Sequence, residues 1–146
     1  MTRPASIINF ERCFWASMLL GVGSLALHWS GMIDGLKSDP TVAPMVESAV
    51  IFVGVALGIG FALSVLLWYF VARKANNIAK WIFVVVMGFG AVSTLTSLND
   101  PTSPTGLALA ISLVSTALTA LSILFLFRPD ARAWFGKDAV DPRTFE

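Results

Sequence analysis

The chain has 146 residues, of which 56% are hydrophobic and only 13% are charged, and its mean hydropathy is +0.78. A soluble domain carries about 25% charged residues, so this composition does not provide the surface of a water-soluble protein. The net charge of +1 excludes a broad basic surface for nucleic acid. Because Cys13 is the single cysteine, an internal disulfide, a cysteine-based zinc cluster and a Cys-x-x-Cys redox pair are also excluded.

The first apolar run follows a short polar head that contains Arg3, Glu11 and Arg12. We expect this head to lie along a membrane surface. Residues 13–33 then carry no formal charge, and a helix of that length rises roughly 30 Å, the thickness of a bilayer's hydrocarbon core. The run is too long for a cleavable signal peptide, so it predicts a retained first span.

Three further apolar runs have spanning length, and prolines, glycines or charges separate them. They cover residues 48–72, 81–98 and 106–127. The tail, residues 128–146, begins with Pro129 one residue in and has Gly136 a few residues later, which predicts a one- or two-turn helix. Trp134 and Phe135 favour the headgroup region for that helix. The sequence therefore predicts one all-α transmembrane domain over residues 1–146, a four-helix bundle.

Lysines and arginines predict the orientation of such a bundle, because they are retained on the cytoplasmic side. With four spans, the head, the central turn and the tail share one side. That side carries nine of the ten basic residues, and Lys37 alone lies opposite. The nine are Arg3, Arg12, Arg73, Lys74, Lys80, Arg128, Arg132, Lys137 and Arg143. We expect both termini in the cytoplasm, with Arg73, Lys74, Lys80, Arg128 and Arg132 setting topology and contacting anionic lipid or an acidic partner.

Small residues at four-residue spacing predict where the helices touch, because close backbone approach drives helix association in lipid. Such ridges occur in the second and fourth runs, and their candidate packing residues are Gly54, Gly58, Gly60, Ser112 and Thr116. The Ser and Thr residues of the third and fourth runs also admit a second interpretation, as the lining of a polar path.

His28 is the only ionisable side chain predicted inside a span, which makes it the candidate polar intramembrane residue. Its place near Trp29 and Asp34 favours an interfacial or packing role. A haem held by two histidines needs a second histidine, and the acids lie in loops, so no catalytic triad can be assembled. Cys13 at the inner boundary is a conceivable acylation site, although a plain thiol is the simpler interpretation. The sequence predicts no enzyme, no cofactor and no metal site.

Two segments at the predicted inner boundary carry a family resemblance, Phe10-Glu11-Arg12-Cys13-Phe14-Trp15-Ala16-Ser17 and Phe127-Arg128-Pro129-Asp130-Ala131-Arg132-Ala133-Trp134-Phe135. They resemble the corresponding segments of small uncharacterised four-span inner-membrane proteins of bacteria. The resemblance implies an inner-membrane location and does not point to any particular activity. In size the chain resembles small multidrug resistance transporters. Those transporters depend on a glutamate in the first span, and residues 13–33 contain no acid.

Two functions follow as hypotheses. The first is a non-enzymatic accessory or assembly subunit that acts through helix–helix contacts with another membrane protein or with itself. The alternative is a small-solute transporter or channel, as a homo-oligomer. A haem- or quinone-binding redox subunit is a third class, and its haem version predicts a coloured protein.

Overall fold

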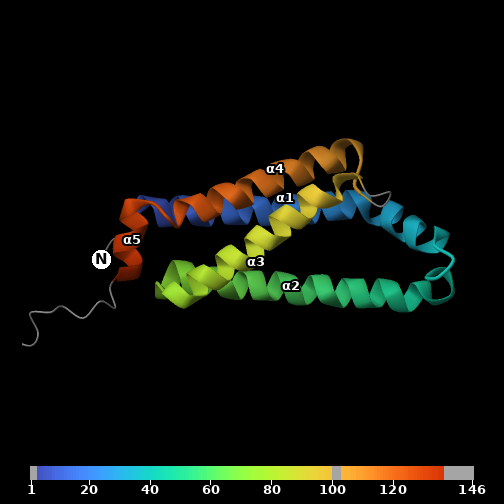
Figure 1. Ribbon diagram of the computed structural model, residues 1–146, viewed down its shortest axis with the longest axis horizontal. Helices are drawn as coiled ribbons and strands as arrows, with labels where there is room; N and C mark the ends of the chain where they lie inside the picture. The colour runs from blue at the N-terminus through green and yellow to red at the C-terminus, as the bar shows by residue number, and fades with distance from the viewer. Residues whose placement is uncertain (1–2, 100–102, 137–146) are drawn as a thin grey trace, which may run out of the picture.

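A computed structural model describes residues 3–99 and 103–136 (Figure 1). This part of the chain is all-α and contains no strand. Its elements are α1 (Ala5–Ser38), η1 (Ala43–Met45), α2 (Val46–Lys74), α3 (Asn77–Thr96), η2 (Ser97–Asn99), α4 (Gly106–Phe125) and α5 (Pro129–Phe135). The short helix expected in the tail is therefore present as α5.

Four helices are long and apolar enough to cross a membrane, which confirms the predicted number of spanning helices. Their outer faces carry large hydrophobic side chains with nothing over them: Phe52 of α2 is 74% exposed and Phe89 of α3 is 77% exposed. Lipid, unlike water, accommodates such a surface without cost.

The polar head belongs to the same helix as the first predicted span. Helix α1 begins at Ala5 and continues for 34 residues to Ser38. The reason is the position of the prolines, since Pro4 precedes the helix, Pro40 follows it and none lies between. A helix ends where proline removes a donor and blocks the turn, so the head and the first span form one rod.

The central turn between α2 and α3 uses two residues with distinct roles. Ala75 adopts φ 52°, a left-handed conformation that ends α2, and its amide donates to the carbonyl of Phe70. The Asn76 side chain then caps α3 by accepting hydrogen bonds from the amides of Ile78 at 2.9 Å and Ala79 at 3.1 Å. This turn reverses the chain within two residues and fixes Lys80 in the first turn of α3.

The helices are unequally packed. Helices α1 and α4 lie side by side along most of their length and share the most extensive contact in the fold (Figure 1). Helix α3 crosses the bundle diagonally, from the end of α2 near the central turn toward the far end of α4. Helix α2 makes sparser contacts with α1 and α3.

The buried core is concentrated at one end of the bundle. We call this the basic end: it holds the start of α1, the Ala75–Asn76 turn and α5. The buried apolar residues here come from every helix or its immediate flank: Ile7, Phe10, Phe14, Val71, Ala72, Ala79, Phe83, Leu126, Ala131 and Phe135. Toward the opposite end, the buried residues among those that the structure describes are Ser24 and Ala108, which contact each other. The basic end is therefore the structural anchor of the molecule.

Candidate functional site

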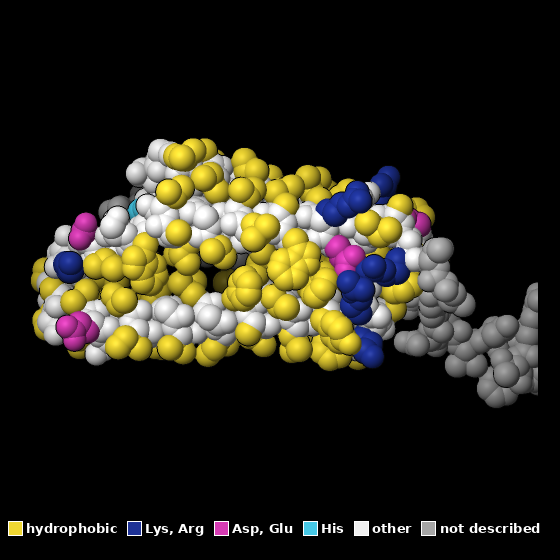
Figure 2. Space-filling view, turned by 180° about the vertical axis from the view of Figure 1, so that it is seen from behind, with side chains coloured by type: hydrophobic (Ala, Val, Ile, Leu, Met, Phe, Trp, Pro, Cys, Tyr) yellow, Lys and Arg dark blue, Asp and Glu magenta, His cyan; other side chains and the backbone are white. Residues whose placement is uncertain are grey.

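Basic side chains gather at the basic end, as Figure 2 shows on the face it displays. Glu11 of α1 lies among them and is mostly buried, with 15% of its side chain exposed. Arg3 donates to its Oε2 at 2.8 Å, and the Nε of Arg73 lies 3.5 Å from its Oε1. One carboxylate therefore links the start of α1 to the end of α2 across two cations.

An aromatic cluster lies next to this ion-pair network. Phe14 is 1% exposed, and its ring lies 5.8–6.4 Å from the rings of Phe10, Phe83 and Trp68. These separations fall within the range in which aromatic pairs attract one another. Arg73 also lies over the Trp68 ring at 5.7 Å. The cluster holds α1, α2 and α3 together.

The five predicted topology residues have different surroundings in the structure. Arg73 joins Glu11, and Lys74 beside it is exposed. Lys80 is buried, with 8% of the residue exposed, and its ammonium lies against the rings of Phe127 and Phe135. Arg128 lies over the Phe125 ring at 5.8 Å, and Arg132 is exposed on α5. The central turn and the start of the tail, expected on one side, are in direct contact.

Helix α5 is attached to the start of α1 through Asp130. The Ser6 hydroxyl donates to its Oδ1 at 2.5 Å and the Ser6 amide donates to its Oδ2 at 3.0 Å. These bonds, the hydroxyl bond first, hold the pKa of the Asp130 carboxyl below its ordinary value. Proline at the first helical position and the acid in the first turn both favour a helix starting here.

We predict that attachment of α5 weakens in acid. Because the folded-state pKa of Asp130 is lowered, its stabilising effect is complete above the ordinary carboxyl pKa of about 4 and is lost as the pH falls through the folded value. Hydrogen-exchange protection factors of the α5 amides should be constant from neutral pH down to about 4 and then decrease. Ser6→Ala should lower protection at neutral pH and flatten this acid dependence. Thr41→Ala, which removes a bond to Asp39 at the opposite end, should change neither.

A seam of small residues joins α1 to α4. The Ser24 hydroxyl donates to the carbonyl of Ala108 at 2.7 Å, and the Ser115 hydroxyl donates to the carbonyl of Ser17 at 2.8 Å. A Cβ placed at Gly21 would lie 3.4 Å from the Ser115 hydroxyl. Hydroxyls that bond directly to a backbone across the interface require close approach of the two helices, which small residues permit.

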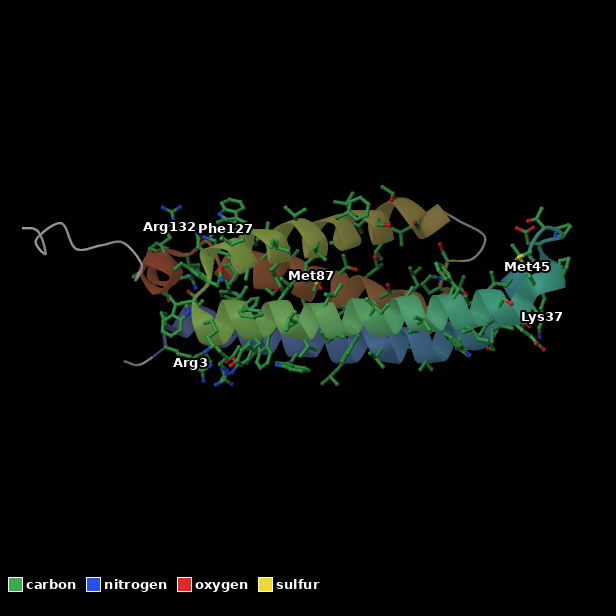
Figure 3. The ribbon with its side chains drawn as sticks, turned by 90° about the horizontal axis from the view of Figure 1, so that it is seen from below. Arg3, Lys37, Met45, Met87, Phe127 and Arg132 are labelled. Carbon is green, nitrogen blue, oxygen red and sulfur yellow. The ribbon has the colours of Figure 1, made fainter. Side chains whose placement is uncertain are left out.

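A groove opens between this pair and the other two helices, and we call it the central groove. It encloses about 610 Å³ and is lined by residues from all four spanning helices, including Leu57 and Phe61 of α2 and Met87 of α3. Figure 2 shows the molecule hollowed midway along its length, and Met87, labelled in Figure 3, lies about halfway along the bundle. The groove walls are mostly apolar.

The three predicted packing glycines of α2 face no neighbouring atom. A Cβ at Gly54, Gly58 or Gly60 would meet no atom within 4 Å, although Gly60 lines the central groove. Thr116 donates to the carbonyl of Ser112 within α4, a local bond that relates no two helices. The packing role of all five residues remains a prediction.

The comparisons with known proteins give no lead. No protein-family model, curated protein or solved structure matches the chain.

His28 lies half-buried in α1, with its ring against the backbone of Gly31. Within residues 3–99 and 103–136, no group of three or more His, Cys, Asp or Glu side chains is arranged to hold a metal ion. The burial of Lys80 was not predicted from the sequence, because the three aromatic rings around its ammonium come from three separate segments. The sequence feature that indicates this burial is Trp81 next to Lys80, together with Phe127 and Phe135 on either side of Arg128-Pro129.

Proposed function

We propose that this chain is a non-enzymatic accessory or assembly subunit that binds a transmembrane helix in its central groove. The observation that carries the proposal is the contrast between two faces. The seam between α1 and α4 is closed, with hydroxyls of Ser24 and Ser115 bonded across it. The facing surface of α2 has the same small-residue character at Gly60 and Ser64 but lines open space.

The chemistry of the groove favours a helix as its occupant. Gly60 and Ser64, one turn apart, offer the small surface that lets a second backbone approach closely. Leu57 and Phe61 flank them with apolar contact area. The Ser64 hydroxyl already donates to the Gly60 carbonyl at 2.7 Å, so its donor is satisfied without a solute.

Photo-crosslinking in native membranes tests this proposal. Benzoylphenylalanine in place of Phe61, which lines the groove, should give a protein adduct of discrete mass. The same residue in place of Phe52 is the matched control, because Phe52 lies on α2, is 74% exposed and does not line the groove. An adduct of twice the chain mass of 15.7 kDa identifies a second copy, and another mass identifies a different partner.

A second variant links the adduct to the groove itself. Gly60→Leu places a large side chain in the groove and should abolish the Phe61 adduct. Gly58→Leu changes the same residue type outside the groove lining and should preserve it. Equal adducts from positions 52 and 61, or none at either, would contradict helix binding in the groove.

One observation favours a small-solute transporter or channel as the second candidate. At the opposite end, the hydroxyl-bearing residues Ser93, Thr94, Ser97 and Ser112 line a pocket of about 370 Å³. Flux of a specific solute into liposomes that contain the purified protein would support this candidate against the first.

We also propose that the chain lies in a bacterial inner membrane with both termini in the cytoplasm. Support comes from the distribution of charge, since Lys37 is the one Lys or Arg of the described residues at the opposite end. We predict that reporter fusions after Lys137 and within the loop at Asp39 report opposite sides, the first cytoplasmic. A same-side result would refute a four-span topology.

A further inference from the structure

Lys80 is the most enclosed basic side chain that the structure describes. Its ammonium lies 4.8 Å from the Phe135 ring centroid, 5.4 Å from Trp81 and 5.6 Å from Phe127. All three distances are within the range of cation–π attraction. The enclosure is built by the first turn of α3, the residues after α4 and the end of α5.

The charge of Lys80 is not balanced within the described part of the chain. The ion pairs there join Glu11 to Arg3 and Arg73, and Asp34 to Lys37. Both oxygens of Asp130, the acid of α5, accept hydrogen bonds from Ser6. Arg132 lies three residues before Phe135 on α5, at the same end as the Lys80 ammonium, and its positive charge repels that ammonium.

A buried lysine beside a second cation is costly unless an anion joins the two charges. Aromatic faces offset part of that cost for Lys80 but contribute little for Arg132, which points outward at the basic end (Figure 3). A phosphate suits this arrangement, since a lysine and an arginine provide a point charge and a forked donor for its oxygens.

The surroundings favour a phosphate that carries hydrocarbon. Trp81 is 52% exposed beside Lys80, and its ring contacts Phe127 at 5.6 Å. About one turn further into the spans, Val85 of α3 is 66% exposed and Leu124 of α4 is 63% exposed. An apolar surface therefore leads away from the cations along both helices.

We propose that Lys80 and Arg132 together bind the phosphate of an anionic phospholipid, whose acyl chains lie along α3 and α4. The site goes beyond helix binding in the central groove and uses none of the residues named for it. It also differs from a diffuse basic surface, because it requires these two cations and not their neighbours.

Native mass spectrometry of the full chain in detergent, titrated with phosphatidylglycerol or phosphatidylcholine, tests the proposal. We expect one phosphatidylglycerol to bind more tightly than phosphatidylcholine. Lys80→Gln and Arg132→Gln should each weaken its binding about fivefold, the loss that one basic residue near an anionic surface implies. Lys74→Gln removes a charge from the same turn at an exposed position and should leave the dissociation constant unchanged.

Four results would overturn the proposal. The first is equal affinity for the two lipids in the wild-type chain, and the second is an equal loss in Lys74→Gln, which would indicate diffuse attraction. The third is competition by inorganic phosphate at the lipid's own concentration, which would assign the site to free phosphate. The fourth is tighter lipid binding when Asp138 and Asp141 are both replaced by asparagine, which would assign the anion to the chain's own tail. Arg132→Gln, at an exposed position, keeps the test valid if Lys80→Gln does not fold.

Discussion

Phe14→Ala should lower the free energy of unfolding by about 3 kcal/mol, the low end of the range for removing a buried phenylalanine. Phe14 is 1% exposed and its ring contacts four others, from Phe10, Trp15, Trp68 and Phe83. The low end applies because lipid tails are as apolar as the core, so only the packing and cavity terms are lost. Reversible unfolding in mixed micelles, followed by tryptophan fluorescence, measures the change.

The matched control for that substitution is Phe89→Ala. Phe89 lies in α3 and is 77% exposed, so its loss removes no internal contact. We expect a change within about 0.5 kcal/mol, as at other exposed positions. Similar effects of the two substitutions would show that the basic end is not the anchor of the fold.

Ala108→Leu should destabilise the chain by about 1–3 kcal/mol, the usual cost of overpacking a tight interface. Ala108 is 6% exposed, and its carbonyl accepts the Ser24 hydroxyl at 2.7 Å. A leucine there pushes α1 away from α4 and breaks that bond. The same unfolding measurement applies, and hydrogen exchange at α1 near Ser24 should increase.

Ala110→Leu provides the comparison for the seam. Ala110 lies two residues further along α4 and is exposed, so the added side chain meets lipid or detergent. We expect unfolding to be unchanged within about 0.5 kcal/mol. If Ala110→Leu destabilises as much as Ala108→Leu, the pairing of α1 with α4 described above is wrong.

The number of spanning helices and the meeting of the central turn with the tail were predictable from sequence, because length and charge determine both. Which helices pack against each other was not predictable from the sequence. Gly54 and Gly58 on α2 look as suitable for packing as Gly21 on α1, yet only Gly21 lies near a residue of a neighbouring helix. A ridge of small residues indicates that a helix can be approached closely, and it does not identify the helix that approaches.

The enclosure of Lys80 was unpredictable for a related reason. The pattern of Lys80 beside Trp81 is local, but Phe127 and Phe135 reach it only because α4 and α5 fold back to the central turn. The continuity of α1 has a different cause. Arg3, Glu11 and Arg12 mark the edge of the apolar run that predicts a span, but they do not end the helix. Charges end a membrane span, whereas prolines end the helix itself.

Because the core is confined to the basic end, buried packing holds α2 at one end only. The helix has 29 residues and is about 44 Å long. Its fully buried residues, Val71 and Ala72, lie near its C-terminal end. Residues 46–70 of α2 include no buried side chain, although Leu67 and Trp68 pack against the edge of the core. The width of the central groove therefore depends on packing at the basic end and on the short connection through η1 at the other end, because few buried contacts of α2 lie between them.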